Sequence, residues 1–175
     1  MSTPDDLTIR PVRDADRDAL WPILRDVIRP GDTYAIDPDI SRDDLLTLWC
    51  DAPAACHVAE MGGRILGTYY IKTNQQGGGA HVCNCGYITA PEARGRGLAR
   101  AMCEHSQDAA RDLGYEAMQF NFVVASNVGA IALWTKLGFE TVGRLPRAFR
   151  HPEQGLVDAL VMFKWLEDGQ NIQSG

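Results

Sequence analysis

The pattern of hydrophobic and polar positions divides the first third of the chain into four elements. Residues 8–12 alternate as in a short strand. From Asp14 on, apolar residues recur at the spacing of a helix, and they are Leu20, Leu24, Val27 and Ile28. An acidic loop follows between Gly31 and Asp39, and Ser41 with Asp44 is spaced as a capping box for a short helix. We therefore expect strand, helix, loop and helix in this order.

The remaining two thirds alternate strands with two longer helical patterns. Strands are expected at 55–60, 64–72, 81–89, 118–124, 139–145 and 156–165. A helix is predicted from Leu98 to Gly114, where Gly114 suits a left-handed cap and the apolar face is expected to run through Leu98, Met102, His105, Ala109 and Leu113. Ser126 or Asn127 can cap a second helix, which ends at Gly138. Adjacent strands favour antiparallel pairing, whereas strand, helix and strand in succession favour one parallel pair. The expected fold class is α/β with a mixed sheet.

Composition bounds the domain count and the partners. The 175 residues, 45% of them hydrophobic, suffice for one core, so we expect residues 1–175 to form a single domain with a frayed polar tail from Gln170 to Gly175. The 17 Lys and Arg against 23 Asp and Glu give a net charge of −6, which disfavours nucleic acid and anionic membranes as partners. Small or cationic substrates fit this balance better.

The cysteines and the N-terminal residues indicate in which cellular compartment the protein is expected. Five cysteines, an odd number, show neither a zinc spacing nor a disulfide framework, so we predict no metal site and a reducing cytoplasm. The chain starts without a basic and apolar leader, and no apolar run approaches about 18 residues, so we expect neither export nor a membrane span.

A glycine-rich junction lies between the strand ending at Thr89 and the helix beginning at Leu98. Its glycines, Gly95 and Gly97, allow close approach of an anion, and helix-start N–H groups attract negative charge. Leu98-Ala99 stands where a nucleotide-binding P-loop needs Lys-Ser or Lys-Thr, and Arg100 stands where a dinucleotide fingerprint needs glycine or alanine. The alternative is that the glycines only make a tight turn.

Two segments carry a family resemblance. Arg94-Gly95-Arg96-Gly97-Leu98-Ala99 resembles the (Gln/Arg)-x-x-Gly-x-(Gly/Ala) acetyl-coenzyme A motif of the GNAT acetyltransferase superfamily. The segment 127–139, with its Asn127, Ala130, Trp134, Lys136 and Gly138-Phe139, is similar to that family's Asn-x-x-Ala and Tyr-x-Lys-x-Gly-Phe segment. The resemblance implies a mostly antiparallel sheet of six to seven strands, helices on both faces and a splayed central strand pair. Dimers are common in the family, so it also allows a homodimer.

The resemblance implies how acetyl-CoA would be held. The strand end would bond the pantetheine arm, amides from Gly95 to Arg100 would hold the pyrophosphate, and arginines would add charge. For the arginines, a solvated surface charge is the alternative. The residues assigned to the cofactor are Tyr87, Ile88, Thr89, Arg94, Gly95, Arg96, Gly97, Leu98, Ala99, Arg100 and Asn127.

The implied chemistry is direct attack of an amine on the thioester. Backbone N–H groups near Ile88 and Thr89 would stabilise the oxyanion. The tyrosine that serves the family as general acid is replaced by Trp134, whose indole is no useful proton donor at neutral pH. Water or another tyrosine is then the proton source. His57, Glu60 and His81 are weaker candidates for a general base, with solvent-facing positions as the alternative.

Two asparagines within strands are candidates for positioning the acceptor. Asn84 and Asn121 are unusual because asparagine is depleted in strands and its amide needs partners. Together they could bind a carboxylate and an amine, and the alternative is that they satisfy each other or the backbone. Their sequence contexts resemble a fungal branch that acetylates imino acids such as L-azetidine-2-carboxylate. Tyr34, in the acidic loop, could close over the substrate.

The combined interpretation is a cytoplasmic, acetyl-CoA-dependent N-acetyltransferase of a small amine, with an amino or imino acid favoured. A protein N-terminus or lysine is the second acceptor class, and it needs an open groove. A non-catalytic acetyl-CoA sensor is a second function, which the absent tyrosine at Trp134 keeps open. A pure dimerisation scaffold is the third, and it predicts no coenzyme A binding.

Overall fold

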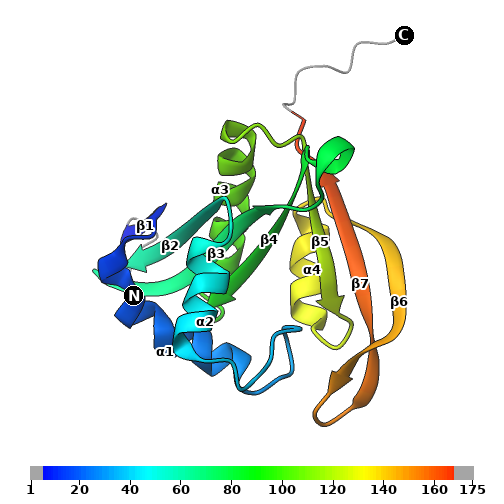
Figure 1. Ribbon diagram of the computed structural model, residues 1–175, viewed down its shortest axis with the longest axis horizontal. Helices are drawn as coiled ribbons and strands as arrows, with labels where there is room; N and C mark the ends of the chain where they lie inside the picture. Colours follow the sequence, from blue (N-terminus) through cyan, green and yellow to red (C-terminus); the bar gives the residue numbers. More distant parts are fainter. Residues whose placement is uncertain (1–5, 168–175) are drawn as a thin grey trace.

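A computed structural model describes residues 6–167, and the tail predicted to be frayed, Gln170 to Gly175, lies outside this range. Within it the chain forms a seven-stranded sheet in the order β1-β2-β3-β4-β5-β7-β6 (Figure 1). The strands are β1 Leu7–Pro11, β2 Ala55–Met61, β3 Arg64–Thr73, β4 Val82–Thr89, β5 Ala117–Val124, β6 Glu140–His151 and β7 Gly155–Trp165. Neighbouring strands are antiparallel except for the parallel pair β4 and β5. The mixed α/β sheet expected from the sequence is confirmed.

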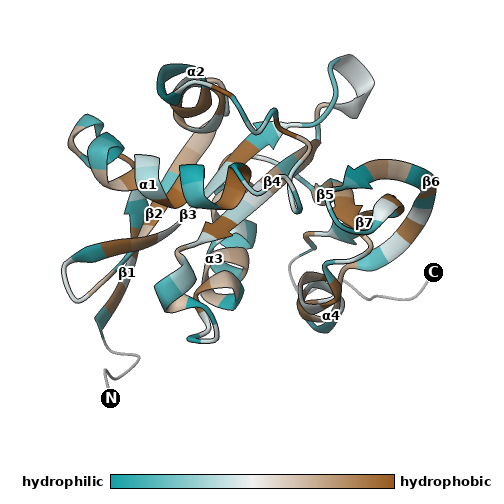
Figure 2. Ribbon diagram, turned by 90° about the horizontal axis from the view of Figure 1, so that it is seen from below, coloured by the Kyte–Doolittle hydropathy of each residue, from teal (hydrophilic) through white to brown (hydrophobic). Residues whose placement is uncertain are grey.

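Helices cover both faces of the sheet, as expected. Figure 2 shows α1 and α2 on one face and α3 and α4 on the other. Their bounds are α1 Arg17–Ile28, α2 Arg42–Leu46, α3 Leu98–Asp112 and α4 Val128–Lys136. Ser41 caps α2 by accepting the N–H of Asp44 at 3.1 Å, so the helix start expected there is confirmed, while the Asp44 carboxylate accepts from the Ser41 hydroxyl at 2.7 Å. A π-helical turn, Thr47–Asp51, then buries Trp49 against the sheet.

The central strand pair is splayed. β4 and β5 are in register only over Val82–Asn84 and Ala117–Gln119, and beyond these residues the two strands separate. On its other edge, β5 pairs with β7, but this register shifts between Phe120 and Val123. The second half of β4 therefore presents one backbone edge to a gap instead of a partner strand. This is the splay that the family resemblance implied.

Two details differ from the sequence-based expectation. Residues 146–151, expected to be loop, continue β6 into a long hairpin with β7, because the Asp158 carboxylate accepts the N–H of Arg147 at 2.8 Å and pairs with Arg144 at 2.6 Å. The contact holds Arg147 at a φ of 51°. On α3, Leu113 is 50% exposed, and the buried face runs through Cys103, Ser106, Gln107 and Ala110.

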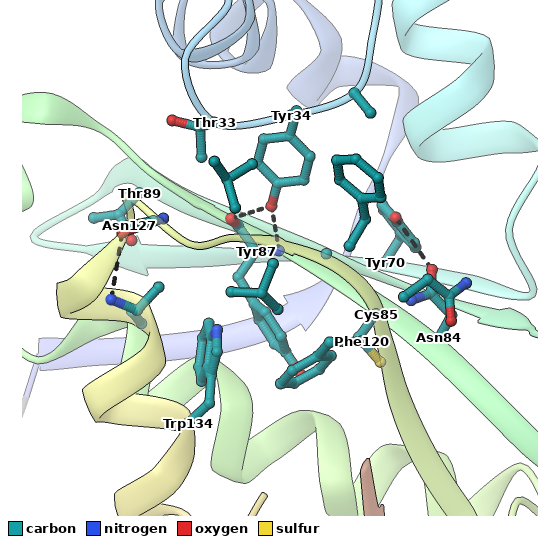
Figure 3. Close-up of a pocket in the computed structure, with 18 of the residues that line it drawn as sticks. Thr33, Tyr34, Tyr70, Asn84, Cys85, Tyr87, Thr89, Phe120, Asn127 and Trp134 are labelled. Carbon is teal, nitrogen blue, oxygen red and sulfur yellow. Dashed lines mark hydrogen bonds between the residues drawn. The ribbon is translucent and has the colours of Figure 1, made fainter. Parts of the chain in front are cut away.

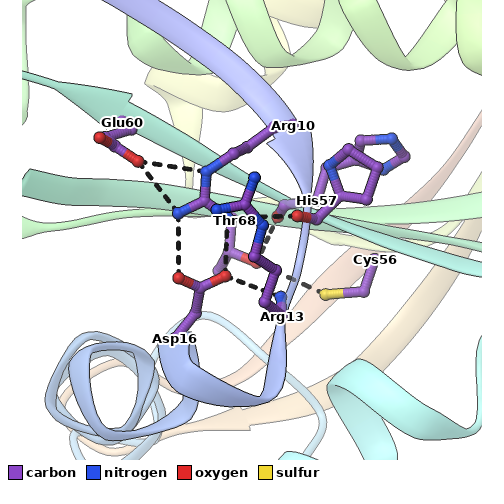
Figure 4. A network of polar contacts seen from close by, with 8 residues as sticks. Arg10, Arg13, Asp16, Cys56, His57, Glu60 and Thr68 are labelled. Carbon is purple, nitrogen blue, oxygen red and sulfur yellow. Dashed lines mark hydrogen bonds and ion pairs between the residues drawn. The ribbon is translucent and has the colours of Figure 1, made fainter. Parts of the chain in front are cut away.

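A charged network ties the first strand to the helices. The guanidinium of Arg10 donates to both carboxylate oxygens of Asp16, at 2.7 and 2.9 Å, and to Glu60 at 3.0 and 3.2 Å (Figure 4). Asp16 also accepts the backbone N–H of Arg13 at 2.7 Å. These hydrogen bonds hold the pKa of Asp16 below its usual value. Glu60, which the sequence analysis named as a candidate general base, is therefore hydrogen-bonded to Arg10 where β1 pairs with β2.

Candidate functional site

A cavity of about 710 Å³ lies in the gap between the splayed strands. Its walls come from β3, β4 and β5, from the loop at 33–36, from the glycine-rich junction and from α4 (Figure 3). Residues far apart in the sequence meet here because β4 and β5 diverge at the centre of the sheet. The candidate site residues that line it are Asn84, Tyr87, Thr89, Arg94, Gly95, Ala99, Asn121, Asn127 and Trp134.

Tyr34 reaches from its loop to the free edge of β4. Its hydroxyl donates to the carbonyl of Tyr87 at 2.6 Å and accepts the N–H of the same residue at 3.0 Å (Figure 3). Burial raises the pKa of the Tyr34 phenol, so it stays protonated and able to donate. That Tyr34 closes over a bound substrate stays a prediction.

The contact also identifies which backbone groups of β4 face the gap. Successive residues of a strand point their N–H and C=O groups to opposite edges. Since the groups of Tyr87 meet Tyr34 in the gap, those of Thr89 point the same way, whereas those of Ile88 point toward β3 and its register partner Thr68. Tyr87 and Thr89 are therefore the residues whose backbone can bond a ligand lying along β4.

The glycine-rich junction leaves its amides available. Gly95 and Gly97 have φ of 76° and 81°, and a side chain added to either would enter open space with no atom within 4 Å. Among the described residues, no hydrogen bond uses the N–H of Gly95, Gly97, Leu98, Ala99 or Arg100, while that of Arg96 is given to Ala93 at 3.3 Å. Free amides at the start of the 15-residue α3 form a cradle that fits a diphosphate.

The three arginines of the junction point in different directions. Arg94 lines the cavity. The guanidinium of Arg96 contacts the sulfur of Met61 at 3.0 Å, and Arg100 pairs with Glu104 at 2.9 Å along α3. The cradle therefore has one cation in the cavity wall, and the other two arginines are engaged outside it.

On the opposite wall, α4 contributes its cap and its tryptophan. The side chain of Asn127 accepts the N–H of Ala130 at 3.3 Å, which confirms Asn127 as the N-cap of α4. Asn127 also lines the cavity. Trp134 is 8% exposed and packs against Tyr87 and Phe120, with ring centroids 5.1 and 5.2 Å away. Trp134 thus forms an apolar wall of the cavity at the position of the family's tyrosine.

Asn84 and Asn121 lie at the end of the cavity where the strands diverge. Asn84 donates to the carbonyl of Gln119 at 2.9 Å and accepts a 3.5 Å contact from the hydroxyl of Tyr70. Asn121 donates to Asn74 at 2.7 Å and accepts from Gln119 at 2.9 Å. Each asparagine keeps hydrogen-bonding capacity beyond these bonds, because an amide has two donor hydrogens and two acceptor lone pairs.

Tyr70 and Lys72 are cavity residues that the sequence analysis missed. Tyr70 lies over β4 at Gly86, where a Cβ would come within 2.7 Å of its ring. Burial raises the pKa of Tyr70 to about 12. Lys72 is the register partner of Asn84, so both side chains rise from one face of the sheet. Once the register of β3 with β4 is known, the alternation of side chains along β3 places Tyr70 and Lys72 on the same face of the sheet as Asn84.

The remaining base candidates lie elsewhere. His57 is 9% exposed and stacks on Tyr69, with centroids 4.8 Å apart, outside the cavity lining. His81 stacks on Trp165 at 6.1 Å. Over residues 6–167, no cluster of His, Cys, Asp and Glu is arranged to hold a metal ion. No helix in that same range is long and apolar enough to cross a membrane.

Comparison with known proteins identifies the family of the chain. Residues 20–139 match the acetyltransferase (GNAT) family. The chain is 31% identical over 161 residues to the N-acetyltransferase aca1 of Schizosaccharomyces pombe, covering 81% of this chain and 77% of that protein. The chain belongs to the GNAT family, and this fungal relative is consistent with the resemblance drawn from Asn84 and Asn121.

Solved structures share the fold. A GCN5-related N-acetyltransferase from Kribbella flavida superimposes with a TM-score of 0.88 at 38% identity, covering 93% of this chain and 99% of that one. The acetyltransferase yncA of Salmonella typhimurium, whose structure holds its cofactor acetyl-CoA, gives a TM-score of 0.79 at 20% identity, covering 97% and 99%. The second likeness is one of fold alone.

Proposed function

We propose that this GNAT-family acetyltransferase transfers the acetyl group of acetyl-CoA directly to a small amine, with an amino or imino acid as the favoured acceptor. One observation carries the proposal: a single cavity joins the free amides of the glycine-rich junction to the amide side chains of Asn84 and Asn121. One end suits a diphosphate and the other suits a small polar molecule. Direct transfer needs both reactants in one space.

The cofactor end uses backbone more than side chains. The N–H groups of Gly95 and of residues 97–100 would hold the diphosphate, with Arg94 adding a positive charge. The free edge of β4 at Tyr87 and Thr89 would bond an extended arm as a strand bonds its neighbour. Asn127 and Trp134 would flank that arm from α4. When bound, acetyl-CoA supplies a thioester whose carbonyl carbon is the electrophile.

The chain provides electrostatic stabilisation at the same strand. The N–H of Tyr87 points into the gap and is held by the sheet, so it can donate to an oxyanion once the Tyr34 hydroxyl, which accepts it at 3.0 Å, moves away. The hydroxyls of Tyr34 and Tyr70 lie in the cavity and carry protons at neutral pH, because burial raises the pKa of both. They are the phenols available where Trp134 replaces the family's tyrosine.

The acceptor end supports a small molecule over a peptide. The loop residues Thr33–Ile36 line the cavity together with Leu48 and Trp49, and Tyr34 crosses it to Tyr87, which limits the space for an acceptor. A protein N-terminus or lysine would need an open groove. The name of the fungal relative, N-acetyltransferase aca1, agrees with transfer to nitrogen. All five cysteines are free, which suits the reducing cytoplasm that the proposal assumes.

A thiol-release assay tests the proposal. The protein is incubated with acetyl-CoA and, separately, free amino acids, imino acids, polyamines, aminoglycosides and short peptides. Release with amino or imino acids supports it, and release with peptides alone favours the protein acceptor. Acetyl-CoA binding without release from any acceptor would identify a sensor. Absence of binding would leave only a scaffold.

A further inference from the structure

The charges that line the cavity are all positive. Among its lining residues the charged side chains are Lys72 and Arg94, and no aspartate or glutamate is present. This contrasts with the chain as a whole, whose net charge is −6. Carboxylates that repel anions are thus kept out of the cavity wall, and the local field favours negatively charged groups.

The two cations lie at opposite ends. Arg94 belongs to the glycine-rich junction, where a diphosphate fits. Lys72 belongs to β3, at the register position of Asn84, where the strands still pair. A single anionic ligand in the cradle accounts for Arg94 but leaves Lys72 without a ligand. The second cation therefore points to a second anionic group, at the acceptor end.

Lys72 is positioned over the cavity and free to bind. Its ammonium lies 5.5 Å from the ring centroid of Tyr70, which also contacts Asn84. Within residues 6–167, Lys72 has no carboxylate partner. Near Lys72, the side-chain amides of Asn74, Asn121 and Gln119 are hydrogen-bonded in series. Such amides can also donate to an anionic oxygen of a ligand.

We propose that Lys72 determines acceptor specificity by binding a carboxylate of the acceptor, so that the substrate class is amines that carry an acid group. This inference rests on the proposed function and specifies its acceptor. Polyamines and other polycations are disfavoured, because the cavity offers them two like charges and no carboxylate. A nearby ammonium also lowers the pKa of the acceptor amine, which increases the neutral fraction that can attack.

Kinetics on matched acceptors tests this role. Each acid is paired with its own carboxamide, using azetidine-2-carboxylate, proline and alanine. The wild type, Lys72→Met and Lys72→Glu are compared, and Arg25→Met serves as the control, since it removes a cation from an exposed position of α1 outside the cavity lining. We expect the wild type to prefer the acid, Lys72→Met to lose about tenfold in kcat/KM for acids with little change for carboxamides, and Lys72→Glu to prefer carboxamides.

Binding provides a second readout that does not need turnover. Calorimetry in the presence of coenzyme A measures the affinity of the wild type and of Lys72→Met for the acid and for its carboxamide. A separate titration measures the affinity of both proteins for acetyl-CoA. Loss of acid binding alone, with acetyl-CoA affinity unchanged, supports the role of Lys72. Equal loss for acid and carboxamide, or no preference in the wild type, overturns it. Absence of thiol release from every acceptor would instead overturn the proposed function.

Discussion

The hydroxyl of Tyr34 bonds both the N–H and the C=O of Tyr87, at 3.0 and 2.6 Å, where β4 has lost its partner strand. A backbone edge left bare inside a protein carries a free-energy cost, and the phenol removes it. The same two groups are those that an extended ligand along β4 would use. Tyr34 is consequently an internal competitor for the free strand edge.

Replacing Tyr34 by phenylalanine should tighten acetyl-CoA binding. The variant leaves the N–H and C=O of Tyr87 without partners in the free protein, so a ligand that bonds them regains more free energy. At about 1 kcal/mol for a net hydrogen bond, we expect the Kd to fall by about five- to tenfold. Calorimetry with acetyl-CoA measures the change, and the variant should also unfold at a lower temperature.

Tyr115→Phe is the matched control for that experiment. It removes a phenolic hydroxyl that bonds Thr73 at 2.6 Å, outside the cavity lining. Its acetyl-CoA affinity should equal that of the wild type. Weaker acetyl-CoA binding in Tyr34→Phe than in Tyr115→Phe would mean that the hydroxyl supports the bound state and does not compete with it.

Gly97→Glu should abolish acetyl-CoA binding. The glutamate side chain would enter the open space before α3 and place a negative charge beside the free amides. The backbone also has a φ of 81°, which disfavours any side chain. Gly114→Glu carries the same strain, at a φ of 90° and with open space around it, but lies at the far end of α3. A folded Gly97→Glu with the affinity of Gly114→Glu would contradict the cradle.

Local patterns predicted the helix caps. The glycines that end α3 and α4, Gly114 and Gly138, and the N-caps at Ser41 and Asn127 depend on neighbours within a few residues, so the sequence carries their signals directly. The splay and the fold came from the family resemblance, and the register of β4 with β5 confirms them. How Asn84, Asn121 and the cofactor residues act remains a prediction.

Long-range contacts could not be predicted in this way. Tyr34 and Tyr87 are 53 residues apart, and no local pattern indicates that a loop tyrosine bonds a strand edge. The segment 146–151 contains a proline and has no alternation, yet Asp158 on β7 holds it in the sheet. Lys72 became a candidate only when the hairpin register placed it beside Asn84. In each case the tertiary partner supplies the information.

Asn121→Ala should impair acceptor use while leaving the cofactor affinity nearly intact. The amide lies where the ladder of β5 with β7 is interrupted, beside the cavity and away from the glycine-rich junction. Loss of a hydrogen bond to a charged group predicts about a tenfold rise in KM or fall in kcat. Steady-state kinetics and acetyl-CoA calorimetry separate the two effects. Equal losses for acceptor and cofactor would show that the bonds to Asn74 and Gln119 make Asn121 structural.

Buried His57 should make the fold acid-sensitive. Burial, and to a lesser degree the charge of His105, lowers the pKa of His57 from 6.5 to about 4, and its Nδ1 is buried without a hydrogen-bond partner. The unfolded chain therefore takes up a proton that the folded chain refuses between those pH values. Stability is fully present above pH 6.5 and falls as the pH drops toward 4, by about 3 kcal/mol.

His57→Phe isolates this contribution. Phenylalanine keeps the stack on Tyr69, which has ring planes 8° apart, but cannot bind a proton. Thermal unfolding of both proteins from pH 7.5 to 4 should give a smaller loss of Tm in the variant, and the two curves should diverge below pH 6.5. Asp16 does not disturb this comparison. Arg10 holds its pKa below 3.8, so the stability that Asp16 contributes is lost only at lower pH, and equally in both proteins. Parallel curves across the window would show that His57 is not the group that titrates.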